Sequence, residues 1–74
     1  WKKAVKSDIE MAAKKRGGVK DYVSEYAKVN HREDFAECIK KFVLDRETLK
    51  YTNPAREKFL TELFTRLWKS HKAP

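Results

Sequence analysis

The chain has 74 residues and a single cysteine, so it forms one domain at most and cannot close an internal disulfide. Lysine and arginine outnumber aspartate and glutamate by 18 to 11, a formal net charge of +7 that favours anionic partners. With no apolar run of membrane-spanning length and no signal peptide pattern, we expect no membrane partner. The sequence shows no recognisable targeting signal, and it is compatible with a location in the cytoplasm or in a virion. Because the first residue is Trp1 rather than Met, we expect a processed product, an excised domain or part of something larger.

The first expected helix covers residues 1–16. Apolar residues recur there at helical spacing, and Gly17-Gly18 follow three cations, which is typical of a helix C-terminus. Asp8 falls inside the apolar stripe, where it is either a frayed, half-exposed position or a buried carboxylate with hydrogen-bond donors around it. Residues 19–27 are mixed in character and predict a short helix or an irregular connection.

The clearest helix signal begins at Asn30. Asparagine is a good N-cap, and Glu33 stands three residues later, as in a capping box. The sequence therefore predicts a helix over residues 31–45. One face of it carries the apolar residues Phe35, Ala36, Cys38, Ile39, Phe42 and Val43. The cysteine on this face is expected to be a plain buried thiol.

The third expected helix covers residues 54–69. Asn53-Pro54 opens it, with asparagine as the cap and proline in the first turn. No alternating run predicts a strand, so the fold class is all-α with three main helices and an optional short one. We expect residues 1–74 to be a single helical segment, the C-terminal part of a larger domain. The large aromatic residues are expected to form a core, or else to anchor a partner; they are Trp1, Phe59, Phe64 and Trp68.

Most chemical motifs are absent from the sequence. There is no glycine-rich phosphate loop, no Cys-x-x-Cys, no nucleophile elbow and no His-Glu-x-x-His. Chemistry-bearing residue types gather only in residues 26–37. Within this stretch, Glu33 and Glu37 are four apart on the polar face of the expected helix, and Glu37 is four before Lys41. A solvated, salt-bridged face explains these carboxylates without any function.

The string Tyr-x(3)-Asn-x(2)-Glu-x-Phe-Ala-Glu at residues 26–37 resembles the downstream half of the active site in the anthrax lethal factor-like zinc metallopeptidases. These are zincins whose third metal ligand is a glutamate. Similar segments occur in zincin-like domains of phage head-associated proteins and bacterial toxins. The resemblance is good over roughly residues 22–44, about a third of the chain, and weaker through the start of the helix at Asn53.

The resemblance implies a role for each matching residue. Glu33 would be the metal ligand, since a carboxylate binds zinc well. Tyr26 would be the catalytic tyrosine, whose phenol donates to a developing oxyanion. Asn30 matches the asparagine at the helix start. Glu37 would stand behind the ligands and orient a histidine.

The sequence departs from the family pattern at the upstream half. Without His-Glu-x-x-His the chain lacks two ligands and the general base, so it is not a complete enzyme by itself. We expect zinc only if an upstream segment or another chain supplies that half, and no cofactor otherwise. The expected partners are the rest of the parent polypeptide or a larger assembly, and a peptide substrate if the domain is active.

Two other functions stay open at this point. A short basic helical chain is suited to a structural role in a larger complex, such as a phage virion. It is also suited to binding nucleic acid, with Lys14, Lys15 and Arg16 as the candidate contacts. Against nucleic-acid binding, the sequence carries none of the usual motifs, and its aromatic residues are spaced for a core.

Overall fold

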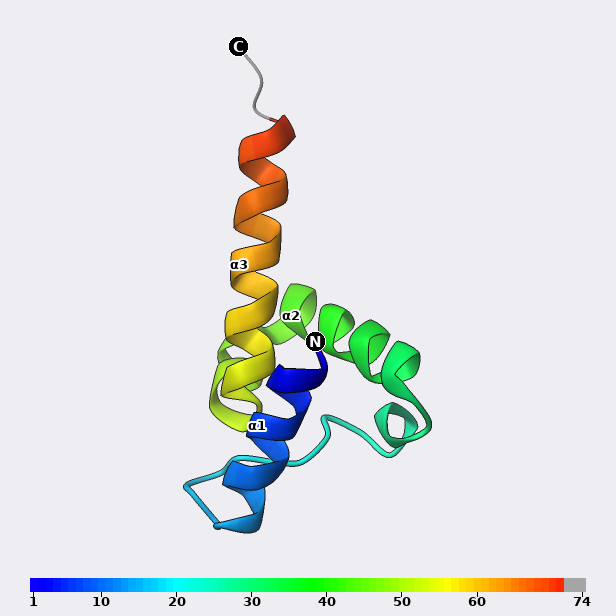
Figure 1. The fold of residues 1–74 in the computed structure, drawn as a ribbon, viewed down its shortest axis with the longest axis vertical. Coiled ribbons are helices and arrows are strands. Elements are labelled where there is room, and N and C mark those ends of the chain that lie inside the picture. The colour runs from blue at the N-terminus through cyan, green and yellow to red at the C-terminus, as the bar shows by residue number, and fades with distance from the viewer. Residues whose placement is uncertain (72–74) are drawn as a thin grey trace.

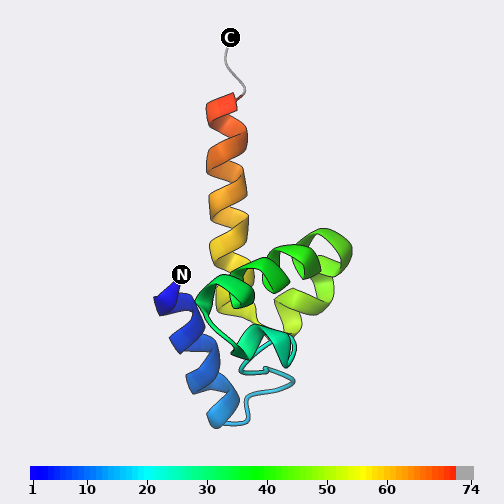
Figure 2. The ribbon, with the colours of Figure 1, turned by 90° about the vertical axis from the view of Figure 1, so that its right-hand side faces the viewer.

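The structure is a computed structural model that describes residues 1–71, and this part of the chain is helical without any strand (Figure 1). The all-α fold class predicted from the sequence is confirmed. The elements in chain order are α1 (Lys2–Ala13), the 3₁₀ turn η1 (Tyr26–Lys28), α2 (His31–Thr52) and α3 (Pro54–His71). The helices α1 and α2 pack around the base of α3, whose C-terminal half extends beyond them (Figures 1 and 2).

Helix α1 ends three residues earlier than the sequence indicated, at Ala13. The chain reverses directly after it, because Lys15 adopts a left-handed conformation with φ +53° and Gly17 another with φ +57°. The cations expected in the last helical turn therefore lie in the turn beyond it. Glycine adopts such a conformation without strain, whereas in lysine the Cβ atom comes too close to the following carbonyl oxygen.

Helix α2 begins where the sequence predicted and continues past the expected end. Its N-terminus is capped by Asn30, whose Oδ1 accepts a hydrogen bond from the Glu33 backbone N–H at 2.9 Å. At Asp45 the backbone leaves helical geometry, with φ −157° and ψ 70°. The Asp45 carboxylate then accepts bonds from the Thr48 hydroxyl at 2.6 Å and from the Thr48 N–H at 3.2 Å. These bonds lower the pKa of Asp45 and start a second helical stretch.

Hydrogen bonds of the Lys20 backbone attach the long connection between α1 and η1 to the junction between α2 and α3. Its N–H donates to the Thr52 carbonyl at 2.7 Å, and its carbonyl accepts from the Asn53 side-chain amide at 2.7 Å. Asn53 is fully buried and also joins the last two helices, since its carbonyl accepts the first helical bond of α3 from Glu57. The sequence marked Asn53 as the side-chain cap of α3, but its Oδ1 accepts a bond from the Thr52 hydroxyl at 2.9 Å and its amide holds the distant loop instead.

The apolar core lies where α1, α2 and the base of α3 meet. Its fully buried members are Cys38, Leu49 and Leu60. Trp1 packs edge-to-face on Phe35 and on Phe59, with ring centroids 4.9 and 5.4 Å apart. Phe64 stacks on Phe42 at 5.3 Å. The core position expected of Trp1, Phe59 and Phe64 is confirmed. Trp68, for which the same was expected, is 67% exposed.

Three charged side chains, one from each helix, are 0% exposed beside this apolar core. Arg56 donates from Nη1 to Asp8 at 3.2 Å and from Nε to Asp34 at 3.1 Å. The Asp8 carboxylate also accepts the backbone N–H groups of Ala55 at 2.9 Å and Arg56 at 3.1 Å, so it caps α3 from another helix. Asp8 is therefore the buried carboxylate, not the frayed position.

Burial raises the pKa of Asp8 above its ordinary value, and the N–H donors of Ala55 and Arg56 oppose that rise. Asp34 accepts a further weak bond from the Cys38 thiol at 3.6 Å. The Tyr22 ring lies against the Arg56 guanidinium, with 5.0 Å from Cζ to the ring centroid. This buried network, which we call the Asp8–Arg56–Asp34 network, holds the helices together.

Candidate functional site

Tyr26 opens η1, and its side chain is 64% exposed. Within this turn Ala27 is buried, with 1% of its surface exposed, and so anchors the turn to the rest of the fold. The Ala27 N–H donates to the Ser24 hydroxyl at 3.2 Å, which fixes the start of the turn. The phenol of Tyr26 is therefore carried on an anchored turn, and the structure directs it to solvent instead of to the core.

Glu33 lies in the first turn of α2 and is half-buried. Its backbone N–H is used by the Asn30 cap. Within residues 1–71 its carboxylate has no hydrogen-bond donor and no ion-pair partner. The side chain that sequence reasoning singled out as a ligand is thus left unused by the fold.

Glu37 follows Glu33 by one helical turn and is tied to the loop before η1. Its Oε1 accepts a hydrogen bond from the Ser24 hydroxyl at 3.2 Å. It lines a small hollow of about 240 Å³ together with Lys40 and Lys41. The ion pair expected between Glu37 and Lys41 is not formed, because Lys41 instead reaches Asp45 at 4.0 Å.

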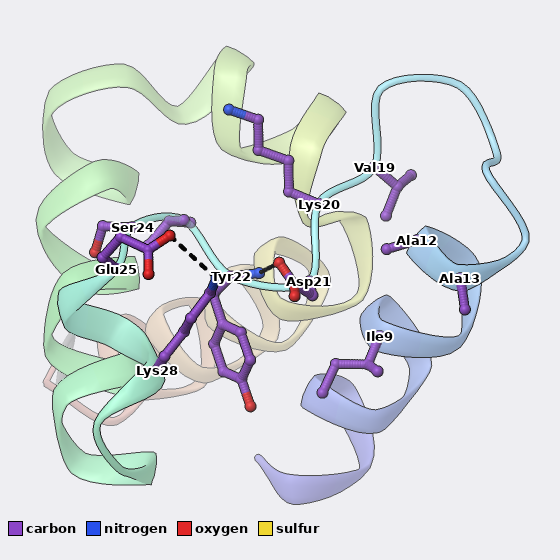
Figure 3. A pocket seen from close by; sticks show the side chains of 11 residues that line it. Ile9, Ala12, Ala13, Val19, Lys20, Asp21, Tyr22, Ser24, Glu25 and Lys28 are labelled. Carbon is purple, nitrogen blue, oxygen red and sulfur yellow. Dashed lines mark hydrogen bonds and ion pairs between the residues drawn. The ribbon is translucent and has the colours of Figure 1, made fainter.

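A larger groove of about 700 Å³ lies next to this site, between the end of α1 and the loop that leads to η1. Figure 3 shows Tyr22 and Lys28 on one side of it, with Ile9 and Ala12 of α1 on the other. Lys28 is paired with Glu25 at 3.1 Å, and this contact raises the pKa of the lysine. Tyr26, Glu33 and Glu37 do not line the groove, so this groove and the predicted site are neighbours and not the same place.

The described side chains do not form a complete metal-binding set. Within the described part of the chain, no three side chains of His, Cys, Asp or Glu type are grouped to hold a metal ion. Asp8 and Asp34 are committed to Arg56, and the buried Cys38 thiol is a poor ligand because burial raises its pKa to about 12. The carboxylate of Glu33 is free, as are those of Glu10, Glu47 and Glu62 among the described residues. It fits one ligand position and leaves the others to be supplied from elsewhere.

The three residues proposed to contact nucleic acid, Lys14, Lys15 and Arg16, lie together in the turn after α1. All three are exposed, and none has an ion-pair partner among the described residues. The turn stands at one end of the molecule, away from the C-terminal half of α3 (Figure 1).

Sequence reasoning missed the buried arginine and the second carboxylate, Arg56 and Asp34. The available signal was the position of each charge, because Asp34 stands four before Cys38 and Arg56 four before Leu60, on the faces that carry core residues. A charge on a core face indicates a buried partner, although nothing in the sequence says which residue that partner is.

None of the helices in the described part of the chain combines the length and the apolarity that crossing a bilayer requires. No family model matches the chain, and no curated protein or solved structure matches it either.

Proposed function

We propose that this chain is the C-terminal helical segment of a zincin-like zinc metallopeptidase domain, to which it contributes a glutamate ligand and an active-site tyrosine. The proposal starts from the spacing of Tyr26, Asn30 and Glu33 and from its resemblance to the lethal factor-like family. One observation carries it further: the carboxylate of Glu33 is unpartnered within residues 1–71, and the nearby Tyr26 phenol is exposed on an anchored turn.

The local structure supports a site that is held in position while its functional atoms stay free. The Asn30 cap fixes the first turn of α2, and buried Ala27 fixes η1. Side chains held by packed, capped elements keep a defined geometry, which a binding or catalytic group requires.

Each residue then has a distinct task. Glu33 would hold the metal, which in this class of enzyme activates water for attack on a peptide bond. Tyr26 would donate its phenol proton in a hydrogen bond to the oxyanion that forms on the substrate carbonyl. Glu37, already held by the Ser24 hydroxyl, would orient a ligand imidazole supplied by the other half of the domain.

The test is the zinc content of the native protein, purified from its source together with whatever polypeptide or assembly accompanies it. We expect near-stoichiometric zinc in the native protein and its loss in Glu33→Gln. Glu47→Gln is the matched control, because Glu47 is an exposed carboxylate on the same helix and far from Tyr26. Zinc that survives Glu33→Gln, or a native protein without zinc, would contradict the proposal.

A second candidate is a structural role in a larger assembly, favoured by the exposed aromatic end of α3. Trp68 and Leu67 are 67% and 44% exposed, and they line an open groove with Phe42 and Phe64. In this case the purified assembly would protect Trp68 from solvent, which a blue shift of its fluorescence relative to the free chain would report. Phe42→Tyr adds no charge and serves as a control for general disturbance of the groove.

A further inference from the structure

We infer that the outer face of α1 and the turn that follows it form a surface for the phosphate backbone of nucleic acid. The cations of this surface are Lys2, Lys3, Lys6, Lys14, Lys15 and Arg16. All six are exposed, and within residues 1–71 none of them forms an ion pair. We call this set the α1 basic surface. The inference does not depend on the proposed function of Glu33 and Tyr26.

Burial of Asp8 leaves this surface with six cations and one exposed carboxylate. The sequence of residues 1–20 contains two acidic residues, Asp8 and Glu10. Asp8 is 0% exposed and paired with Arg56, so it faces α3. Glu10 is left as the one exposed carboxylate on α1. The outer face of α1 and its turn therefore keep an excess of positive charge around Glu10.

The turn adds a second observation that points the same way. Lys15 holds a left-handed conformation, with φ +53°, at a position where glycine is usual after a helix. Gly17 and Gly18 follow within three residues, so glycine is used in this turn, yet the first left-handed position carries a cation. The Lys15 backbone N–H donates to the Ala12 carbonyl at 3.0 Å, and its exposed side chain forms no ion pair among the described residues. This strained position therefore leaves its cation accessible to a ligand.

The composition of the surface selects nucleic acid over the other anionic partners. An anionic membrane is bound tightly by an amphipathic helix that inserts its apolar face, but the apolar face of α1 is packed on α3 through Val5 and its neighbours. An acidic protein is held by aromatic or aliphatic anchors at the centre of an interface. The exposed large apolar residue of α1, Ile9, lines the groove beside the loop that leads to η1 and is not among the cations. Binding to phosphates requires only accessible cations.

The dimensions agree with a backbone contact. The 12 residues of α1 extend about 18 Å, a length over which a duplex carries about ten phosphates. The surface holds no asparagine or glutamine and only one arginine, the residue types that read base edges most often. The contact is therefore expected to be independent of base sequence, with a dissociation constant in the micromolar range at low salt.

The test is fluorescence anisotropy of a labelled 20-base-pair DNA duplex titrated with the chain between 50 and 200 mM KCl. We expect a slope of log K against log salt of about −3 to −5, since each neutralised phosphate contributes about −0.9. Lys3→Gln, Lys6→Gln and Lys14→Gln combined should reduce that slope by about 3. Glutamine has nearly the helix propensity of lysine, so the fold is retained.

The matched control removes the same charge from another part of the molecule. Lys40→Gln, Lys50→Gln and Lys58→Gln combined replace three exposed lysines of α2 and α3 and should leave the slope within about 1 of the original. Equal losses in the two triple variants would overturn the proposal in favour of diffuse net charge. The absence of binding at 50 mM KCl would also overturn the proposal. Tighter binding to poly-glutamate, or to vesicles with one quarter phosphatidylserine, than to the duplex would overturn it as well.

Lys15→Gly separates binding from stability in one variant. Glycine relieves the left-handed strain, so the midpoint temperature of unfolding should rise by a few degrees. The affinity for the duplex at 50 mM KCl should fall several-fold, because one phosphate contact is lost. An affinity equal to that of the original chain would overturn the assignment of this turn to the surface.

Discussion

Asp8 and Arg56 are 48 positions apart, and one carboxylate oxygen of Asp8 accepts both the backbone N–H and the Nη1–H of Arg56. The bonds measure 3.1 and 3.2 Å, and both side chains are 0% exposed. The first helix is therefore joined to the third by a charge that cannot reach water. Such a contact carries a large penalty when only one partner is removed.

Asp8→Ala should lower the free energy of unfolding by about 3–5 kcal/mol, because the buried guanidinium loses a counter-ion and two backbone donors lose their acceptor. Urea denaturation followed by circular dichroism at 222 nm measures the loss. Glu10→Ala is the control on the exposed side of the same helix and should cost less than about 0.5 kcal/mol. Equal effects of the two changes would show that the pair is not formed.

Removing both partners should cost less than the sum of the single changes. Asp8→Leu with Arg56→Met replaces the pair by apolar side chains, and buried pairs treated in this way often lose little stability. Asp34 would then lack its cation, so the full comparison includes Asp34→Leu as a third change. A double-mutant cycle on Asp8 and Arg56 should give a coupling free energy of at least about 1 kcal/mol, and additive losses would argue against direct contact.

Cys38 should make the folded chain sensitive to alkali. Its thiol has an ordinary pKa of 9.0, which burial raises to about 12 in the folded chain. The folded state therefore keeps a proton that the unfolded state releases, so this stabilisation is complete below pH 9 and is lost as the pH rises towards 12. By pH 10.5 the loss is about 2 kcal/mol.

The measurement compares the urea stability of the original chain and Cys38→Ala between pH 8 and 10.5. Lysine and tyrosine titrate in both proteins, so the difference between the two curves isolates the thiol. The original chain should lose stability faster with pH. Parallel curves would mean that the thiol is not buried, and rapid reaction of the folded chain with Ellman's reagent would mean the same.

Asn30→Ala should lower the free energy of unfolding by about 1 kcal/mol, the usual cost of losing an N-cap. The bond at stake is the one that Oδ1 accepts from the Glu33 N–H at 2.9 Å. Asn30→Asp supplies another capping oxygen and should restore most of the loss. Thermal unfolding by circular dichroism reports both variants. If Asn30→Ala is as stable as the original chain, the Asn30 cap does not hold the first turn of α2, where Glu33 lies.

Gly17 and Gly18 should respond to alanine for different reasons. Gly17 has a left-handed φ of +57° and open space around it, so Gly17→Ala should cost about 1 kcal/mol through backbone strain alone. A Cβ on Gly18 would overlap the Tyr51 ring, which is 66% exposed and can swing away. Tyr51→Ala should therefore relieve the cost of Gly18→Ala and leave that of Gly17→Ala unchanged, and thermal unfolding of the two double variants checks this.

The helices were predictable because their signals are local. Asn30 with Glu33 and Asn53 with Pro54 each mark a start within four residues, and both starts are confirmed. The continuation of α2 beyond Asp45 was not predicted, although Asp45 and Thr48 form a second capping sequence of the same kind. The early end of α1 was missed because it depends on a lysine adopting a conformation that usually belongs to glycine.

The pairing of the buried charges could not be predicted from the sequence, for a different reason. The sequence left Asp8 open between an exposed and a buried position, and its partner lies on another helix. Periodicity tells which face of a helix a residue occupies, but not which other helix covers that face. The roles of Glu33 and Tyr26 rest on resemblance and stay predictions, whereas the support beneath them, from Asn30 and Ala27, is visible only in the fold.

The separation between Asp8 and Arg56 also has a consequence for the order in which the chain folds. Contacts between α2 and α3 close short loops, whereas the bond between Asp8 and Arg56 closes a loop of 48 positions and carries a larger entropic cost. We therefore expect α2 and α3 to assemble first and α1 to dock last, with faster amide hydrogen exchange in α1 than in α2. The segment that docks last is the one that carries the α1 basic surface, so a bound polyanion would slow exchange there first.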